Sequence, residues 1–200
     1  MALKIGIGVA VVIVALLIVI ATRPAAFHIE RSAQVNASPD VVFPLINDFH
    51  RWADWSPFEK LDPKMKKTFE GAEAGPGAVY TWSGNSQAGE GRMTLEESKP
   101  DELVAIKLEF TKPMQATNQA TFKLVPSDDG TRVTWSMDGN NGFMGKAFSL
   151  FVNMDKMVGA QFEEGLGNLN TLAQAKKAEP PAEDAPSTAP DSEAAAPATR

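Results

Sequence analysis

Between Ile5 and Ala21, seventeen consecutive residues carry no charge, amide or hydroxyl group. As an α-helix with a rise of about 1.5 Å per residue, this run is roughly 25 Å long, close to the hydrocarbon thickness of a bilayer, about 30 Å. A few flanking residues can extend it, and the long side chains of Lys4 and Arg23 can reach the headgroups. We therefore predict a transmembrane anchor over residues 1–23 that contacts the membrane through residues 5–21.

Two other interpretations of this run stay open. Val19, Ile20 and Ala21 place a small residue where a signal peptidase cuts, which is typical of a cleaved signal peptide. However, the run is longer than a usual signal core of about 7–15 residues, and only one lysine precedes it. A core helix buried within a soluble domain is the third interpretation.

The charges beside the predicted anchor do not settle its orientation. Lys4 lies on one side, and Arg23 and Arg31, partly offset by Glu30, lie on the other, so the positive-inside rule has little to act on. The short segment before the anchor and the long one after it favour a single-pass protein of the cell (inner) membrane with an extracytoplasmic soluble domain. The absence of cysteine fits either compartment and excludes disulfides and thiol nucleophiles.

The far end of the chain, residues 178–200, is rich in alanine and proline. It has no side chain that could join a core, so burial cannot offset its chain entropy and we predict disorder. Its five acidic residues and one arginine account for minus four of the net charge of minus six. The rest of the chain is therefore near minus two, and we expect no nucleic-acid partner.

The middle of the chain reads mainly as β-strands, because apolar and polar residues alternate with a period of two. A proline after Ser38 predicts a short helix, with the serine hydroxyl as its cap, and a second helical turn fits residues 49–55. Asp129-Gly130 is a strong hairpin signal. The predicted strands are residues 27–35, 66–69, 79–83, 91–97, 103–110, 116–125 and 133–137.

From Phe143 onward, apolar residues recur every three or four positions as far as Ala173. This period predicts one amphipathic helix of about thirty residues. An antiparallel sheet has one apolar face that must be covered, and this helix is the element long enough to cover it. Such an arrangement, closed at one end by short helices, leaves a space between helix and sheet.

Three stretches, Val35 to Pro63, Gly75 to Asn85 and Gly139 to Leu169, resemble bacterial SRPBCC (START-like) proteins of the polyketide cyclase/dehydrase and lipid-transport family. The resemblance implies an α+β helix-grip fold over residues 27–176: a curved antiparallel sheet of about seven strands around a long C-terminal helix. The superfamily includes lipid carriers, hormone receptors and aromatic-ring cyclases and has no common catalytic signature. Fold analogy therefore names no reaction. The predicted anchor lies outside the usual domain of this superfamily.

The sequence offers little for metal or nucleophilic catalysis. It has two histidines, no cysteine and no calcium-loop pattern, so we expect no metal and no cofactor. It also lacks a Gly-x-Ser-x-Gly elbow and a Ser-x-x-Lys motif.

Three residues are candidates for acid–base catalysis: His50, Asp155 and Tyr80. Asp155 falls within the apolar stripe of the long helix, where burial would raise its pKa, unless it pairs with a backbone amide, Lys156 or another basic group at the helix edge. His50 lies among aromatic residues, at a cavity rim or on the surface. We expect Glu59 and Asp62, in the following loop, to be solvated.

Aromatic and methionine residues are the notable apolar feature, with four tryptophans, eleven phenylalanines and eight methionines. Such residues suit the wall of a hydrophobic site, although core packing uses the same types. Phe143, between two glycines, could serve in a gate or in an ordinary loop. The candidate ligand-binding residues are Trp52, Trp55, Tyr80, Trp82, Phe110, Met114, Phe122, Trp135, Met137, Phe143, Phe148 and Phe151.

Three functions remain open from the sequence. The first is a membrane-tethered binding domain for a hydrophobic or lipid-like small molecule, the second a cyclase or dehydratase acting on a hydrophobic substrate. The third is a non-catalytic interaction module of a membrane complex, with protein partners unknown. The volume and polarity of the space beneath the long helix distinguish them.

Overall fold

The computed structural model describes residues 2–178. The acidic tail, which we predict to be disordered over residues 178–200, lies outside the described residues except for Ala178. The α-helices are α1 (Ala2–Thr22), α2 (Pro39–Asn47), α3 (Phe143–Phe148) and α4 (Met154–Ala178), and the 3-10 helices are η1 (Phe49–Asp54) and η2 (Pro57–Lys60). The strands are β1 (Ala26–Val35), β2 (Lys66–Gly71), β3 (Ala78–Ser83), β4 (Glu90–Lys99), β5 (Leu103–Lys112), β6 (Ala116–Ser127) and β7 (Gly130–Asn140).

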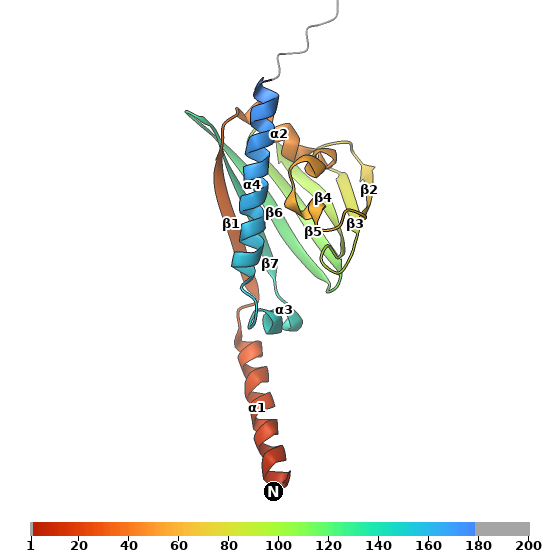
Figure 1. Ribbon diagram of the computed structural model, residues 1–200, viewed down its shortest axis with the longest axis vertical. Coiled ribbons are helices and arrows are strands. Elements are labelled where there is room, and N and C mark those ends of the chain that lie inside the picture. Colours follow the sequence, from red (N-terminus) through yellow and green to blue (C-terminus); the bar gives the residue numbers. More distant parts are fainter. Residues whose placement is uncertain (1, 179–200) are drawn as a thin grey trace, which may run out of the picture.

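The seven strands form one antiparallel sheet in the order β1-β7-β6-β5-β4-β3-β2. The sheet curves around α4, which lies along the β1 and β7 side (Figure 1). Alternation along each strand directs one set of side chains inward: on β6, Ala120, Phe122 and Leu124 are buried while Val125 is exposed. The predicted α+β fold and its seven strands are confirmed. The β6–β7 hairpin also forms, with its turn one residue earlier than predicted, because Ser127 pairs with Gly130.

Helix α4 packs closely on the sheet through a row of buried residues that includes Phe162, Leu166 and Leu169. The rings of Phe162 and Trp135 of β7 stack with centroids 4.1 Å apart. Gly165 permits this approach, since a Cβ there would lie 2.8 Å from the Trp135 ring. This half of the sheet is therefore covered directly by the helix.

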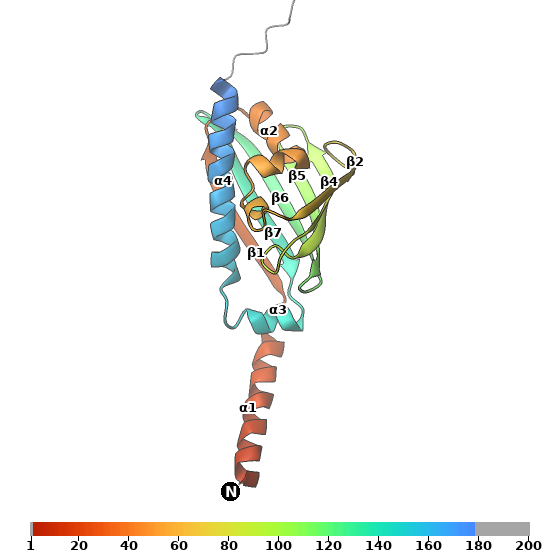
Figure 2. The same ribbon diagram turned by 45° about the vertical axis from the view of Figure 1, so that its right-hand side comes forward.

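The segment formed by α2, η1 and η2 covers the other half of the concave face (Figure 2). Two buried indoles fix it: Trp52 Nε1 donates to the carbonyl oxygen of Ile46 at 3.0 Å, and Trp55 Nε1 donates to that of Leu45 at 2.9 Å. Helix α2 begins with proline, as predicted. The hydroxyl of Ser38 makes no capping hydrogen bond, so that detail of the prediction is wrong.

The prediction of one helix from Phe143 onward is wrong, because residues 149–153 separate α3 from α4. Phe148 and Phe151 follow the helical spacing but are exposed, and therefore do not belong to the buried stripe of α4. The break has a local cause. The side-chain oxygen of Asn153 accepts a hydrogen bond from the backbone N–H of Lys156 at 3.0 Å, which starts a new helix at Met154.

Helix α1 is long and apolar enough to cross a membrane over Lys4–Thr22. Helix α1 extends from the end of the domain at which β1 begins, and α3 lies beside the last turn of α1 (Figures 1 and 2). Lys146 Nζ donates to the carbonyl oxygen of Ala21 at 3.3 Å, and the backbone N–H of Asn141 donates to that of Ala25 at 2.7 Å. Helix α1 is thus joined to the domain at a defined place.

Candidate functional site

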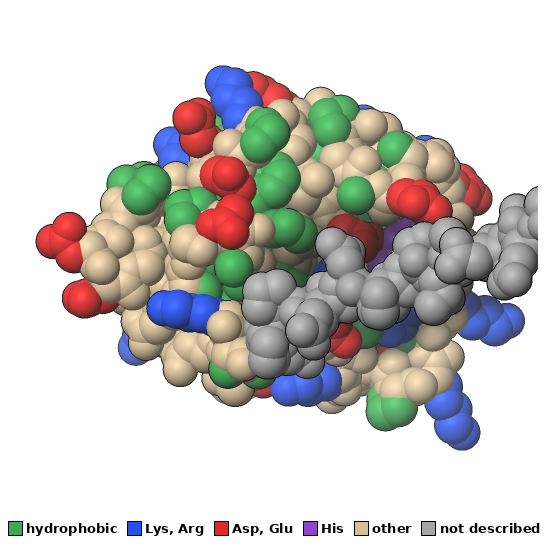
Figure 3. Space-filling model, turned by 90° about the horizontal axis from the view of Figure 1, so that it is seen from above, with side chains coloured by type: hydrophobic (Ala, Val, Ile, Leu, Met, Phe, Trp, Pro, Cys, Tyr) green, Lys and Arg blue, Asp and Glu red, His purple; other side chains and the backbone are tan. Residues whose placement is uncertain are grey.

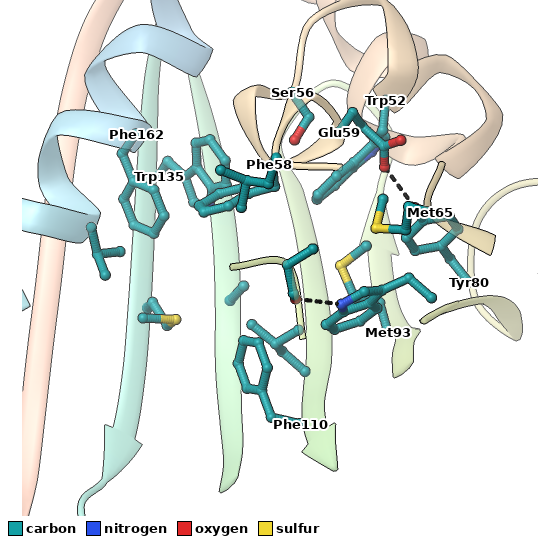
Figure 4. A pocket seen from close by; sticks show the side chains of 17 residues that line it. Trp52, Ser56, Phe58, Glu59, Met65, Tyr80, Met93, Phe110, Trp135 and Phe162 are labelled. Carbon is teal, nitrogen blue, oxygen red and sulfur yellow. Dashed lines mark hydrogen bonds between the residues drawn. The ribbon is translucent and has the colours of Figure 1, made fainter. Parts of the chain in front are cut away.

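A cavity of about 150 Å³ lies between α4, the η1–η2 segment and the inner face of the sheet (Figure 4). It occupies the region where the two covers of the sheet meet. Its lining residues are Trp52, Ser56, Phe58, Glu59, Leu61, Met65, Tyr80, Trp82, Ala88, Met93, Leu108, Phe110, Ala120, Trp135, Met137, Val158 and Phe162. The walls are therefore almost entirely aromatic, aliphatic and thioether groups.

Packing of the aromatic rings holds one wall of the cavity in place. Trp135 lies between Phe162, at 4.1 Å, and Phe122, at 4.7 Å between ring centroids. Phe58 contacts the same indole edge-on at 6.0 Å. Each ring is restrained by its neighbours, so this wall is preformed rather than assembled around a ligand.

A polar cluster of Glu59, Tyr80 and Lys67 lies at the opposite wall. The Tyr80 hydroxyl, from β3, donates to Glu59 Oε1 at 2.7 Å, and Lys67 Nζ, from β2, pairs with Glu59 Oε2. The Glu59 side chain is only 9 % exposed. Burial, and then the neighbouring Glu59 carboxylate, hold the pKa of Tyr80 far above its ordinary value, so Tyr80 remains protonated at neutral pH.

Our expectation that Glu59 is solvated is therefore wrong. Helix η2 begins at Pro57 and turns the Glu59 side chain inward toward the sheet, with Phe58 beside it in the lining. A proline at the first helical position after Ser56 was the signal in the sequence that could have suggested this turn. Asp62 does lie outside the cavity lining, where its Oδ2 accepts from the backbone N–H of Asn85 at 2.7 Å.

Two further polar atoms in the cavity lining have no hydrogen-bond partner among residues 2–178. These are Ser56 Oγ and Trp135 Nε1, and both are buried. An unpaired buried donor costs about 1–3 kcal/mol. Neither atom exposes surface to the cavity, so a bound molecule would reach them only after these side chains turn.

The sequence matches the model of the family described as "Polyketide cyclase / dehydrase and lipid transport" over residues 26–174. The chain belongs to this family. Membership of this SRPBCC-type family supports the assignment of residues 26–174 as a domain that binds a hydrophobic molecule. Helix α1 lies outside the matched residues. Among curated proteins, no relative matches the sequence.

Solved structures share the SRPBCC helix-grip fold at low identity. The Zhui aromatase/cyclase from Streptomyces sp. R1128 is 17 % identical, with a TM-score of 0.56, over 76 % of this chain and 96 % of that one. SA2116 from Staphylococcus aureus, of unknown function, is 14 % identical, with a TM-score of 0.56, over 78 % and 99 %. Mll3558 from Rhizobium loti is 22 % identical, with a TM-score of 0.50, over 74 % and 96 %. At these identities the likeness shows the fold alone.

The twelve predicted ligand-binding residues fall into three groups within this SRPBCC domain. Half of them line the cavity: Trp52, Tyr80, Trp82, Phe110, Trp135 and Met137. Trp55 and Phe122 are fully buried in the core behind it. Met114, Phe143, Phe148 and Phe151 are exposed and outside the lining, because they lie in the β5–β6 hairpin and around α3 at the α1 end of the domain.

The structure places Asp155 outside the cavity lining, paired with a basic group. Arg31 Nη1 and Nη2 each donate to one Asp155 oxygen at 3.0 Å, while Arg31 Nε donates to Glu163 at 2.7 Å. Hydrogen bonding to Arg31 lowers the pKa of Asp155, the opposite of the shift that a buried acid would show. The cavity-acid interpretation of Asp155 is wrong, and the alternative of pairing at the helix edge is correct.

His50 also lies outside the cavity lining. Its Nδ1 is 2.8 Å from Asp48 Oδ1, and its ring stacks on Phe69 with centroids 4.1 Å apart. Of the three acid–base candidates, only Tyr80 reaches the cavity. Within residues 2–178, no three histidine or carboxylate side chains are grouped in a way that could hold a metal ion.

Proposed function

We propose that the protein is a membrane-tethered binding domain for a small hydrophobic molecule. The observation that supports this is the cavity, whose seventeen lining residues include only three with polar side-chain groups other than indole: Ser56, Glu59 and Tyr80. A concave, preformed, mainly apolar site with a few polar groups is the usual form of a small-molecule site. Helix α1 holds this site beside the bilayer, where hydrophobic molecules are concentrated.

The size of the cavity limits the molecule. Drug-sized ligands occupy sites of about 300–1,000 Å³, and an engineered apolar cavity of about 150 Å³ holds benzene. The cavity here has a volume of about 150 Å³. It therefore fits a molecule of one or two rings, or a short alkyl segment, rather than a complete diacyl lipid.

The polarity of the cavity further describes the molecule. Ser56 Oγ and Trp135 Nε1 both have a hydrogen to donate and no partner among the described residues. A ligand that carries an acceptor, such as a ketone, ester or phenol oxygen, would satisfy them once these side chains turn toward it, a gain of about 1–3 kcal/mol each. A purely aliphatic molecule would leave them unpaired, as they are among the described residues.

Binding can be tested with the full-length protein in detergent, using 2-tetralone, a two-ring ketone, and tryptophan fluorescence as the readout. Ala120 of β6 lines the cavity, so Ala120→Phe fills it and should weaken binding by more than about tenfold. Val125→Phe, on the exposed face of the same strand, is the control and should bind as the wild type does. Equal affinity of a folded Ala120→Phe protein would contradict the proposal.

A second candidate function is proton transfer to and from a bound carbonyl compound, supported by the Glu59–Tyr80 pair. A donor and an acceptor lie 2.7 Å apart at an apolar cavity, where one bound molecule could contact both. The Tyr80 hydroxyl would turn from Glu59 to donate to the carbonyl oxygen, while the freed Glu59 carboxylate would accept a proton from the adjacent carbon and later return it. The structural neighbour from Streptomyces sp. R1128 is an aromatase/cyclase by name.

This second candidate has its own test. In D₂O, NMR measures the exchange of the hydrogens next to the carbonyl of 2-tetralone. Acceleration by the wild type, and its loss in Glu59→Gln with binding retained, would support turnover. If the wild type binds 2-tetralone without accelerating exchange, the binding function stands alone.

A further inference from the structure

Four large hydrophobic side chains around α3 are exposed. Phe143 is 50 %, Met144 64 %, Phe148 45 % and Phe151 84 % exposed, and we refer to these four as the α3 surface. They belong to residues 143–151, which run from α3 to the loop before α4. Neither the cavity nor the core uses them, so their hydrophobicity needs another partner.

The α3 surface lies beside the end of α1 at which the domain begins (Figures 1 and 2). Lys146, in the middle of α3, donates to the carbonyl oxygen of Ala21 at 3.3 Å. Ile20, in the last turn of α1, is only 6 % exposed, unlike most of that helix. The two helices are therefore in contact over the final turn of α1.

The position of α1 fixes the height of this contact relative to a bilayer. A membrane crossed by Lys4–Thr22 has one of its surfaces at Thr22 and Arg23. Residues that contact the last turn of α1 must then lie at headgroup level. The exposed residues found there are phenylalanine, methionine and Arg23, with the half-buried Lys146 beside them.

We propose that the α3 surface docks into the headgroup region of the phospholipid bilayer that α1 spans. Aromatic and apolar side chains beside basic ones are the composition of segments that lie in the plane of a membrane interface. This inference rests on the membrane tether in the proposed function. The bilayer is the occupant favoured over a second copy of the chain, because the surface is continuous with the membrane-spanning helix.

Docking would also set the orientation of the cavity. Val158, near the start of α4, and Phe110, near the end of β5, belong to the lining at the α1 end of the domain. The β5–β6 hairpin points to the same end (Figure 1), and Met114 at its tip is exposed. Two points of membrane contact, α1 and the α3 surface, would hold this end of the cavity next to the lipid.

The test uses the full chain, which contains no cysteine, so that single cysteines can carry an environment-sensitive dye. Met144→Cys and Phe151→Cys report on the α3 surface, and Val12→Cys reports on the middle of α1. Val125→Cys, at a position 56 % exposed on β6, is the matched control outside the α3 surface. Each protein is reconstituted into vesicles of phosphatidylcholine and phosphatidylglycerol that contain a quencher either at the headgroup or in mid-chain.

We expect loss of fluorescence with headgroup quencher at positions 144 and 151, with mid-chain quencher at position 12, and with neither at position 125. If position 12 is quenched while 144 and 151 remain as bright as 125, docking is overturned and the tether stands. If position 12 is not quenched, the tether itself fails. Disulfide-linked dimers of the unlabelled Met144→Cys protein after mild oxidation with copper phenanthroline, together with no lipid quenching of the labelled protein, would overturn docking and assign the surface to a second copy.

Discussion

Tyr80 is the most perturbed titrating residue in the cavity. Its hydroxyl is buried and donates to Glu59, and ionisation would place a second negative charge 2.7 Å from that carboxylate. Burial is the larger cause of the raised pKa and the Glu59 carboxylate the smaller one. Tyr80 is also the only tyrosine of the chain, so its ionisation can be observed alone.

We expect the tyrosinate absorbance of the native protein to appear only well above pH 10. In denaturant, the pKa of Tyr80 should return to the ordinary tyrosine value of about 10. Because the unfolded chain loses this proton first, Tyr80 stabilises the fold fully below about pH 10 and less as the pH rises further. Glu59→Gln removes the smaller cause and should lower the pKa of Tyr80 partway. A native titration near pH 10 would show that Tyr80 is not buried as described.

The residues of the cavity were predictable where they lie in regular strands. The period of two in β3, β5 and β7 directs Tyr80, Trp82, Phe110, Trp135 and Met137 inward, and all five line the cavity. Glu59 was not predictable in this way, because it lies in a polar loop with no periodicity. Its burial depends on Tyr80, which is 21 residues away in the sequence.

At the scale of the element, two glycines of α4 allow the effect of packing on stability to be distinguished from the effect of helix propensity. Gly165 faces the sheet, where an added Cβ would lie 2.8 Å from the Trp135 ring and 3.0 Å from Pro57. Gly167, two residues along the same helix, has nothing within 4 Å of such a Cβ. Trp135 is held between two other rings, so it cannot move aside cheaply.

We expect Gly165→Ala to lower the free energy of unfolding by about 1–2 kcal/mol, because overpacking costs more than alanine gains as a helix former. Gly167→Ala should raise it by about 0.5–1 kcal/mol through propensity alone. Urea unfolding in detergent measures both changes. Stabilisation by both substitutions would mean that α4 does not approach Trp135 closely.

The elements themselves were largely predictable, and the error concerns how the last two are joined. Strand alternation, Pro39 after Ser38 and the hairpin signal at Asp129-Gly130 were local signals, and the corresponding elements are present. The apolar spacing of Phe148 and Phe151 is also helical, yet periodicity does not report which face is buried. The capping side chain of Asn153 decided the break, a signal that a search for apolar periodicity does not register.

At the scale of the whole molecule, α1 and α4 run in nearly the same direction in both ribbon views, with α3 between their ends (Figures 1 and 2). The other end of the domain, seen in Figure 3, carries acidic and basic side chains around its rim, with hydrophobic side chains among them. The charged rim suits an end that points into water. The family resemblance implied the domain fold, but the relation of α1 to the domain depends on contacts such as Lys146 with Ala21, which no local pattern encodes.

This arrangement predicts that the domain stands upright on the membrane. Helix α4 has 25 residues and, at about 1.5 Å per residue, carries its last residues about 37 Å from its start near α3. With acceptor dyes on lipid headgroups, energy transfer from a donor at Met144→Cys should therefore be strong, and that from Lys177→Cys much weaker. Lys177 is exposed, so the label leaves the core intact. Equal transfer from the two positions would mean that the domain lies flat on the bilayer, with α4 parallel to its surface.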